Sequence, residues 1–314
     1  MNAATYILPV RLADASPIPE LAEYVRGLDG VEAIVVDGSS PQLFAALHDA
    51  LRGVARHVRP NLHSGRNGKA CGVLTGLQLA TTSRIVVADD DVRYDRANLR
   101  EVLALLDEAE VVRPQNFFDP APWHAILDGS RSLINRALDG DWPGTLAFRR
   151  AALPDGYNAD VLFENFELVQ TIRARGGREL VARSVFVARR PPATSHFFSQ
   201  RVRQAYDEFA RPVRLGIALA VLPGLLAALL LRRFDVVAAT AATTTALALY
   251  GWLRGGAFAH FSFLCVLAAP VWMLERALCA WLAVYQRVRF GGVRYGDVVI
   301  PAAASKARVR GWAS

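Results

Sequence analysis

The sequence Arg84-Ile85-Val86-Val87-Ala88-Asp89-Asp90-Asp91-Val92 joins a short apolar run directly to three consecutive carboxylates. The apolar run predicts a buried strand, and the residues from Arg96 to Leu106 have a helical pattern. In an open α/β sheet, ligands bind at the carboxyl ends of strands. Three adjacent acids suit a hard divalent metal that also carries phosphates. The alternative is a solvated acidic turn that caps the next helix.

The surrounding sequence alternates short apolar runs with amphipathic segments. The runs lie at residues 5–10, 31–36, 57–59, 84–88, 111–112 and 178–187, and the helical patterns at residues 18–28, 41–51, 70–80, 96–106, 123–138 and 160–175. This rhythm predicts an α/β fold with a mostly parallel sheet that is covered by helices on both faces. We expect this domain to occupy residues 1–210.

Two further residues at predicted strand ends and helix starts have side chains suited to a nucleotide. Asp37 follows a buried run, where its carboxylate can accept hydrogen bonds from a base or a ribose, although an Asp-Gly turn is the alternative. Lys69 opens a helix after a flexible loop, so it can reach a diphosphate together with the helix amides. It is not a Walker lysine, because the sequence has no Gly-x-x-x-x-Gly-Lys-Ser/Thr run.

The composition and net charge limit the classes of protein to which this chain can belong. Of the 314 residues, 53% are hydrophobic, and the excess lies after Val213. The net charge is +7, with arginines at the ends of the apolar segments, which suits an anionic cytoplasmic membrane surface and not nucleic acid. The spacing of Cys71, Cys265 and Cys279 indicates neither a metal site nor a disulfide framework. The first residues lack the features of a signal peptide, so we expect a cytoplasmic domain.

The apolar excess predicts a membrane region at residues 211–286. Spans are expected at about residues 215–231 and 236–253, and a soluble core helix is a plausible alternative only for the second. A third apolar stretch, residues 258–285, contains Glu275-Arg276, which must be buried against protein or lie outside the membrane. We expect it to form a lipid-surface helix or a re-entrant pair.

The arginine-rich residues 287–314 are predicted to be a basic cytoplasmic tail. Because the α/β domain and this tail would then share a side, the number of crossings must be even. These features together predict a multi-pass protein of the cell membrane.

The ordered set of motifs over about residues 5–210 resembles a family 2 glycosyltransferase with the nucleotide-sugar-binding GT-A fold. The matching segments are Val35-Val36-Asp37-Gly38-Ser39, Gly68-Lys69-Ala70, Asp89-Asp90-Asp91 as an Asp-x-Asp motif, Gly144 to Arg150, Glu164 to Leu168, and Gln200-Arg201-Val202-Arg203 as the start of a Gln-x-x-Arg-Trp motif. The set in this order is far more specific than any single member.

The resemblance implies roles for individual residues. The donor, a nucleotide-diphosphate sugar, would be bound by Asp37, Lys69, Asp89, Gln200 and Arg203. A Mg²⁺ or Mn²⁺ ion would be held by Asp89 and Asp91, with Asp90 pointing away.

Two of these assignments have a structural alternative. His196 is a candidate third metal ligand, and its alternative is a loop histidine. For Arg201 and Arg203, the alternative is a basic helix that rests on lipid headgroups.

Two positions depart from the family pattern. Asn165 stands where the family has its catalytic aspartate, and an amide cannot take a proton from an acceptor hydroxyl. Glu164 is the first candidate to replace it, followed by Asp160 and Glu167. Gln204 stands where the last motif has tryptophan, and the nearest aromatic residue, Tyr206, is two positions away.

The predicted function is metal-dependent, inverting transfer of a sugar from a nucleotide-diphosphate sugar to a lipid or lipid-linked acceptor at the cytoplasmic membrane face. One alternative is a polysaccharide synthase, against which the few spans and Gln204 argue. The other is an inactive relative that binds the donor or acts as a scaffold, which Asn165 keeps open.

Overall fold

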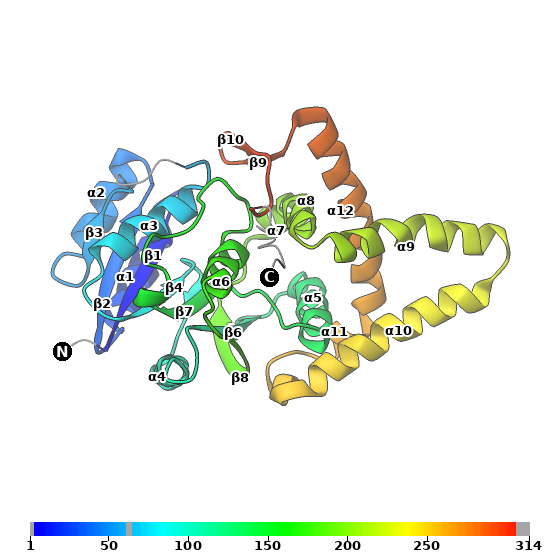
Figure 1. Ribbon diagram of the computed structural model, residues 1–314, viewed down its shortest axis with the longest axis horizontal. Coiled ribbons are helices and arrows are strands. Elements are labelled where there is room, and N and C mark those ends of the chain that lie inside the picture. The colour runs from blue at the N-terminus through cyan, green and yellow to red at the C-terminus, as the bar shows by residue number, and fades with distance from the viewer. Residues whose placement is uncertain (1–2, 61–64, 306–314) are drawn as a thin grey trace, which may run out of the picture.

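The structure is a computed structural model that describes residues 3–60 and 65–305. Its N-terminal part is an α/β domain built on an eight-stranded sheet with the order β3-β2-β1-β4-β7-β6-β8-β5 (Figure 1). The strands are β1 (Ala4–Val10), β2 (Val31–Asp37), β3 (Arg56–Val58), β4 (Arg84–Ala88), β5 (Val92–Arg93), β6 (Val111–Phe118), β7 (Thr145–Arg149) and β8 (Glu179–Arg189).

The first half of the sheet is parallel, as the alternating pattern predicts. Strands β3, β2, β1 and β4 are parallel neighbours, β7 enters antiparallel between β4 and β6, and β6 and β8 are parallel again. The helices of this domain are α1 (Ile18–Arg26), α2 (Pro41–Ala50), α3 (Gly68–Leu79), α4 (Arg96–Leu105), α5 (Ala125–Ala137), α6 (Glu164–Ala174), α7 (Thr194–Ser199) and α8 (Arg201–Tyr206), with 3₁₀ turns η1 (Arg150–Ala152) and η2 (Asp207–Ala210). The predicted fold class is confirmed.

Two apolar layers hold the sheet, one on each face. One layer packs α1, α2 and α4 on the sheet, and the other packs α3 and α6. Removal of these apolar side chains from water is the main force that fixes the sheet, and with it the position of Asp89 at the end of β4.

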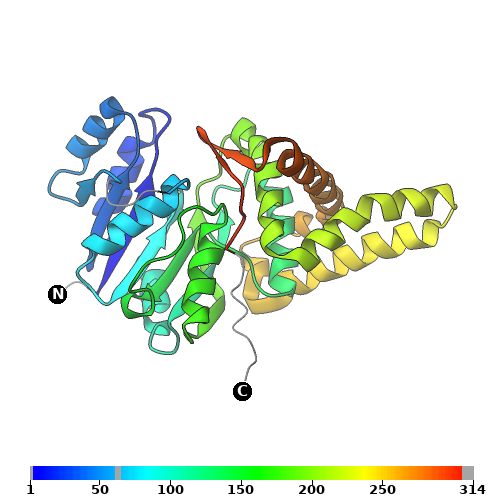
Figure 2. The ribbon, with the colours of Figure 1, turned by 45° about the horizontal axis from the view of Figure 1, so that its top comes forward.

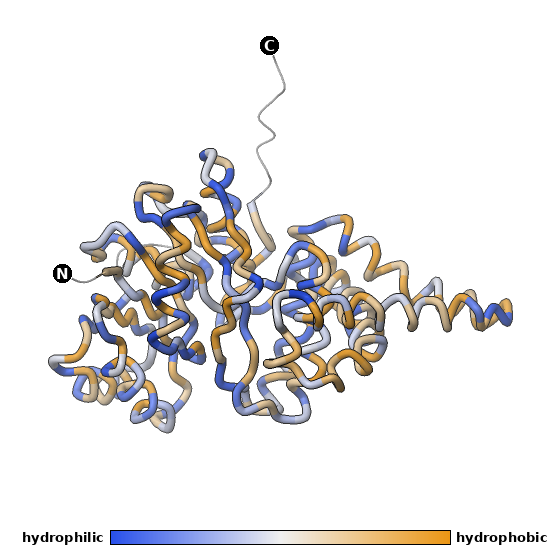
Figure 3. Tube along the Cα trace, turned by 90° about the horizontal axis from the view of Figure 1, so that it is seen from below, coloured by the Kyte–Doolittle hydropathy of each residue, from blue (hydrophilic) through white to orange (hydrophobic). Residues whose placement is uncertain are grey.

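Two long apolar helices leave this body as an antiparallel hairpin, at the right of Figure 1 and in the hydropathy view of Figure 3. They are α9 (Pro212–Leu230) and α10 (Phe234–Leu253), which lie at the two predicted spans. By length and composition, the segments 212–230 and 234–259 qualify as membrane spans. Leu226, Leu230 and Leu231 at the far end are exposed, as lipid-facing side chains would be.

The third apolar stretch forms η3 (Arg254–Ala259), the short α11 (Leu264–Leu267) and one long helix, α12 (Ala269–Phe290). A single helix and not a re-entrant pair therefore accounts for most of it. Glu275 lies 2.7 Å from the buried Arg201 of α8, and Arg276 is also buried. The ionisable pair is thus buried against protein, which is one of the two arrangements expected.

The residues after α12 return to the catalytic domain. A hairpin of β9 (Val293–Tyr295) and β10 (Val298–Ile300) is followed by an extended run to residue 305, and Figure 2 shows this segment between the sheet domain and the helices. We call residues 291–305 the strap. The strap is part of the folded body, whereas the sequence indicated only a basic tail; residues 306–314 lie outside the described residues.

A first prediction concerns the contact between α3 and β1. A Cβ on Gly76 would overlap the Ile7 side chain, and a β-branched residue in a central strand cannot move away. We expect Gly76→Ala to lower the free energy of unfolding by about 1–3 kcal/mol, the usual cost of overpacking. Gly68→Ala is the matched control on the same helix, because no non-neighbouring atom of residues 3–60 or 65–305 lies within 4 Å of a Cβ at that position. Equal melting temperatures for the two variants would contradict this account.

Candidate active site

The strand ends and helix starts meet around Lys69, the second residue of α3. Its Nζ lies 2.5 Å from Asp89 Oδ1 and also forms an ion pair with Glu164 Oε1 at the start of α6. Burial lowers the pKa of Lys69, but the charges of Asp89 and Glu164 more than offset this and leave the pKa raised. The ammonium group therefore stays charged and joins three elements that are far apart in sequence.

Arg189 at the end of β8 balances the other acids. It contacts Asp91 through Nε at 3.0 Å and Nη2 at 2.7 Å, and its Nη2 lies 3.6 Å from Asp89. Burial, followed by the charges of Asp91 and Asp89, raises the pKa of Asp90 to about 6. Asp89 and Asp91 thus converge on one cation.

The arrangement fits a divalent metal ion in place of these cations. In the described part of the chain, no three His, Cys, Asp or Glu side chains are already gathered as a metal site. Asp89 and Asp91 nevertheless share Arg189, and carboxylate oxygens are what Mg²⁺ and Mn²⁺ prefer. Burial, then Arg203, lowers the pKa of His196, which favours the neutral imidazole that binds metals, and Asp91 opposes the shift.

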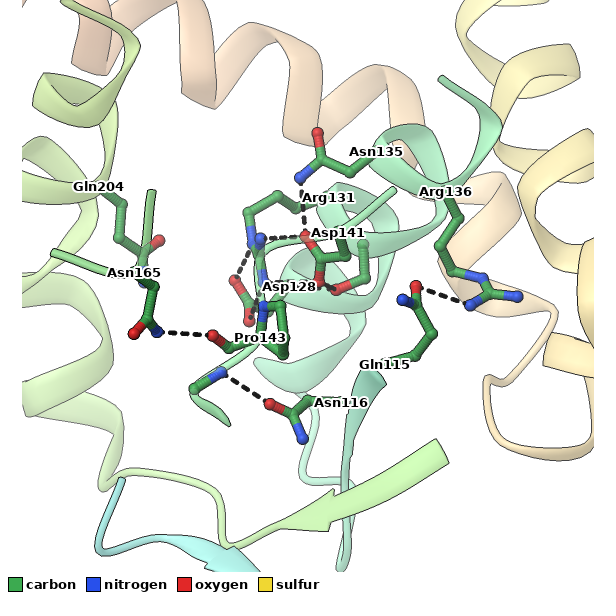
Figure 4. Close-up of polar contacts among 12 residues, drawn as sticks. Gln115, Asn116, Asp128, Arg131, Asn135, Arg136, Asp141, Pro143, Asn165 and Gln204 are labelled. Carbon is green, nitrogen blue, oxygen red and sulfur yellow. Dashed lines mark hydrogen bonds and ion pairs between the residues drawn. The ribbon is translucent and has the colours of Figure 1, made fainter. Parts of the chain in front are cut away.

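Gly144 beside β4 is fixed by the same acids. Its carbonyl accepts a hydrogen bond from the Asp89 backbone N–H at 2.8 Å, and a Cβ there would lie 2.6 Å from Asp89 Oδ2. Only glycine leaves room for the carboxylate. The loop before Gly144 is held by a buried network of Asp128, Arg131 and Asp141 (Figure 4). Burial raises the pKa of Asp128, but Arg131 and Arg201 outweigh it, so the pKa is lowered.

Asp37 lies at the far end of the site, on the nucleoside side of the predicted donor. It is buried, accepts a hydrogen bond from Ser39 N–H at 2.7 Å and lies 3.3 Å from His57 Nε2. Burial raises the pKa of Asp37, but the hydrogen bonds from His57 and Ser39 outweigh burial and leave the pKa below its usual value. His57 stacks on Phe44 at 4.2 Å, and the Arg59 guanidinium lies 4.0 Å from the same ring. This aromatic and basic cluster beside Asp37 suits a nucleobase, and no sequence pattern beyond a short strand pointed to it.

The polar side chains at and just before the start of α6 make separate contacts. The buried Asn165 donates from Nδ2 to the Pro143 carbonyl at 2.9 Å (Figure 4). Glu167 accepts a hydrogen bond from Ser305 N–H, and Asp160 accepts one from Arg66 N–H. Of the three carboxylates considered as the catalytic base, Glu164 is the one that forms an ion pair with Lys69 among the described residues.

The residues of the Gln-x-x-Arg segment divide between the site and the scaffold. The Gln200 side chain contacts His196, and the Arg203 guanidinium lies 5.0 Å from the centre of the Tyr295 ring. Arg201 instead is buried and pairs with Glu275 at 2.7 Å and Asp128 at 3.2 Å. Contact of Arg201 with lipid headgroups is therefore not what the structure shows.

Tyr206, the aromatic residue nearest to Gln204 in sequence, does not face the site. Tyr206 is fully buried and its hydroxyl donates to the Pro301 carbonyl at 2.7 Å. Gln204 accepts a hydrogen bond from Arg201 at 2.9 Å. Tyr206 thus holds the strap and does not line the site.

Two ionisable residues that respond to the charge of Glu164, Asp207 and Tyr295, were not predicted from the sequence. Burial, followed by the charge of Glu164, raises the pKa of Asp207 to about 7, and its buried Oδ1 has no hydrogen-bond partner within the described part of the chain. The pKa of Tyr295 is raised by burial and then by Glu164. Asp207 lies just beyond the last recognisable motif, and Tyr295 in a segment that read as a tail, so no local pattern pointed to either.

The comparison with known proteins agrees with this geometry. The profile of glycosyl transferase family 2 matches residues 7–150. This part of the chain belongs to glycosyl transferase family 2. The matched segment of this glycosyltransferase carries Asp37, Lys69 and the Asp89–Asp91 run. No protein among those with curated functions matches the sequence.

One solved structure supports the same fold, and a second matches with a lower TM-score. A mannosyltransferase from Pyrobaculum calidifontis, PcManGT, in complex with GDP-Man and Mn²⁺, shares 21% identity with a TM-score of 0.57, over 89% of this chain and 87% of its own. That alignment must extend beyond residue 210 into the C-terminal helices. The glucosyl-3-phosphoglycerate synthase of Mycobacterium tuberculosis shares 18% identity over 61% of this chain and 72% of its own, with a TM-score of 0.43.

A second prediction follows from the Asn165 contact. Asn165→Asp restores the family residue but replaces a donor by a carboxylate that faces the Pro143 carbonyl. Because a buried polar group without a partner costs about 1–3 kcal/mol and a charge costs more, we expect a lower melting temperature and no gain in turnover. Asn158→Asp, at an exposed position, is the control. A faster and equally stable Asn165→Asp enzyme would refute this role.

A third prediction uses the pKa of Asp207. Because this pKa is raised in the folded protein, ionisation destabilises the fold as the pH rises from about 4, the unfolded pKa, to about 7. We expect Asp207→Asn to raise the melting temperature at pH 8 and to leave it nearly unchanged at pH 4. Asp155→Asn, at an exposed carboxylate, should show no such trend. A pH-independent gain for Asp207→Asn would contradict the assignment.

Proposed function

We propose that the protein is a membrane-anchored, inverting glycosyltransferase that uses a nucleotide-diphosphate sugar and a divalent metal ion. The observation that carries this proposal is the ion cluster in which Lys69 joins Asp89 to Glu164. The cluster places Asp89, a proposed ligand of the metal ion that would bind the donor diphosphate, next to the Glu164 carboxylate at the start of α6. The GDP-Man and Mn²⁺ bound by the Pyrobaculum enzyme are consistent with this chemistry.

The donor would lie along the edge of the sheet from Asp37 to Asp91. Asp37 with the His57–Phe44 surface would hold the nucleoside, and Asp89 and Asp91, with His196 as a third candidate, would hold Mg²⁺ or Mn²⁺. When bound, this ion neutralises the diphosphate and makes it a better leaving group. Gln200 and Arg203 would contact the donor diphosphate from α8, since guanidinium groups bind phosphate oxygens in pairs.

The base would be Glu164. In the structure its carboxylate is tied to Lys69, and a donor diphosphate would offer Lys69 other oxygens and so release Glu164. Glu164 would then take the proton of an acceptor hydroxyl as the acceptor oxygen bonds to the anomeric carbon. The bond from that carbon to the diphosphate breaks in the same displacement, which inverts the configuration and releases the nucleoside diphosphate.

The acceptor is proposed to be a lipid or a lipid-linked molecule at the cytoplasmic face of the cell membrane. Helix α9 starts two residues after η2, which follows α8 directly, so the site lies beside the apolar hairpin. Arg211 and Arg254 mark the two ends of the hairpin that return to the body, where cytoplasmic basic residues are expected.

A fourth prediction tests the function. The full chain in detergent with Mn²⁺ is expected to turn over at least one of GDP-Man, UDP-Glc and UDP-GlcNAc. Because metal binding and general-base catalysis each contribute strongly, Asp91→Asn and Glu164→Gln should each lower turnover by about 100-fold or more. Asp14→Asn, at an exposed carboxylate away from the cluster, is the control.

The binding of GDP and UDP, measured by calorimetry, separates the outcomes. Glu164→Gln should still bind the nucleotide of the active donor, whereas Asp91→Asn should lose the dependence of that binding on Mn²⁺. Full activity in Asp91→Asn would refute the metal assignment. Nucleotide binding without any turnover would instead favour an inactive donor-binding relative.

A further inference from the structure

The strap crosses the entrance to helix α6. Leu162 and Phe163, the two residues before Glu164, donate backbone hydrogen bonds to the carbonyls of Ala302 and Ala303 at 2.9 and 2.8 Å. Ser305 N–H donates to Glu167 Oε2 at 2.8 Å. The strap therefore fixes the backbone from which Glu164 projects.

Other contacts hold the strap against the remaining walls. Tyr206 of α8 donates to the Pro301 carbonyl, and Asp297 pairs with Arg11 after β1. The buried strap residues pack with α8, α12 and the residue before α6 in one apolar cluster, which contains Leu162, Ala205, Tyr206, Cys279, Ala283, Val293, Ile300 and Ala303. The strap is thus bonded to the catalytic domain at both ends and along its length.

This framework presents Tyr295, the last residue of β9, to the ion cluster. The ring is half-buried, with the Arg203 guanidinium 5.0 Å from its centre. Beyond burial, the charges that most affect the pKa of Tyr295 are those of Glu164 and Lys69. An aromatic ring of the strap therefore lies on Arg203, packs on the cluster that contains Leu162, two residues before Glu164, and is within electrostatic range of the carboxylate that we assign as the base.

We propose that the strap is the acceptor-side wall of the active site and that Tyr295 binds a sugar ring of the acceptor beside Glu164. This inference rests on the proposed function. The donor groups Asp37, Asp89 and Asp91 lie at strand ends, whereas Tyr295 comes from the strap, which packs on α8 and α12. An aromatic face packs against the apolar C–H face of a sugar ring and leaves a ring hydroxyl free for Glu164.

The substrate class that follows is a glycosylated lipid and not a simple alcohol. A bare lipid hydroxyl or phosphate would present no ring to Tyr295. Because the strap leaves α12, which packs against α9, the same segment would place a membrane-held acceptor and shape its head group. Without this wall the site would still bind the donor, but it would no longer select the acceptor.

The fifth prediction is a protection experiment that needs no turnover. The full chain in dodecyldimethylamine oxide, a detergent without sugar, is nitrated with tetranitromethane, and Tyr295 and Tyr285 are followed by peptide mass spectrometry. Octyl β-D-glucoside is expected to slow nitration of Tyr295 at least threefold. Octyl tetraethylene glycol ether, with the same tail and no sugar ring, should not. Tyr285, exposed on α12, is the internal reference and should respond equally to both.

Variants provide the second arm. With the donor that the wild type uses, Tyr295→Ala should lower kcat/KM for transfer to octyl glucoside at least tenfold and leave KM for the donor within twofold. Tyr295→Phe should retain most of the activity, since the ring face remains. Tyr285→Ala is the matched control, and truncation after Ser305 should leave both parameters unchanged.

The outcomes separate this inference from the proposed function. Equal protection by both amphiphiles, or none, would overturn it, as would equal protection by GDP or UDP with Mn²⁺ alone, which would place Tyr295 on the donor side. Protection by the glucoside in a chain that turns over no donor would support the wall and refute the glycosyltransferase activity.

Discussion

The ion cluster of Lys69 with Asp89 and Glu164 is the interaction on which the geometry of the site depends. Lys69 and Glu164 lie at the starts of α3 and α6, and Asp89 follows β4, so their contact requires α3 and α6 to pack in one layer on the sheet. A charge in this largely buried place is stable only with its partners, because a lone buried ion costs several kcal/mol. The cluster therefore couples the fold of the domain to the chemistry of its edge.

A second set of charges joins the catalytic domain to the C-terminal helices. Arg201 contacts Asp128 of α5 and Glu275 of α12, and α12 in turn packs against α9. Buried ion pairs of this kind specify one arrangement more than they add stability. Their place at the junction gives the helices a fixed orientation relative to the site, which apolar contacts alone would leave less defined.

The sequence predicted the features that have a local pattern. The buried run into Asp89, the helix that Lys69 opens and the strand that ends at Asp37 were placed correctly, because each depends on residues within one element. The two long apolar helices were found for the same reason. The fold class and the family followed from the order of these pieces.

The rest depends on contacts between distant segments. Arg189 meets Asp91 across 98 positions, and the strap meets α6 across more than 130. No periodicity encodes such pairings, so Arg189, Asp207 and Tyr295 were missed. Asn165 was read as a lost base, whereas the structure shows its amide holding the Pro143 loop, a role that only the partner reveals.

The path of the strap also bears on biosynthesis. The site draws on residues from Asp37 to Ser305, and the two long apolar helices are translated between its first and last parts. The sheet domain can therefore fold while the chain is still being made, but the site is completed only after the helical hairpin has left the ribosome. A chain whose last described segment had not yet docked would lack the strap contacts at the start of α6, which would link activity to completion of the fold.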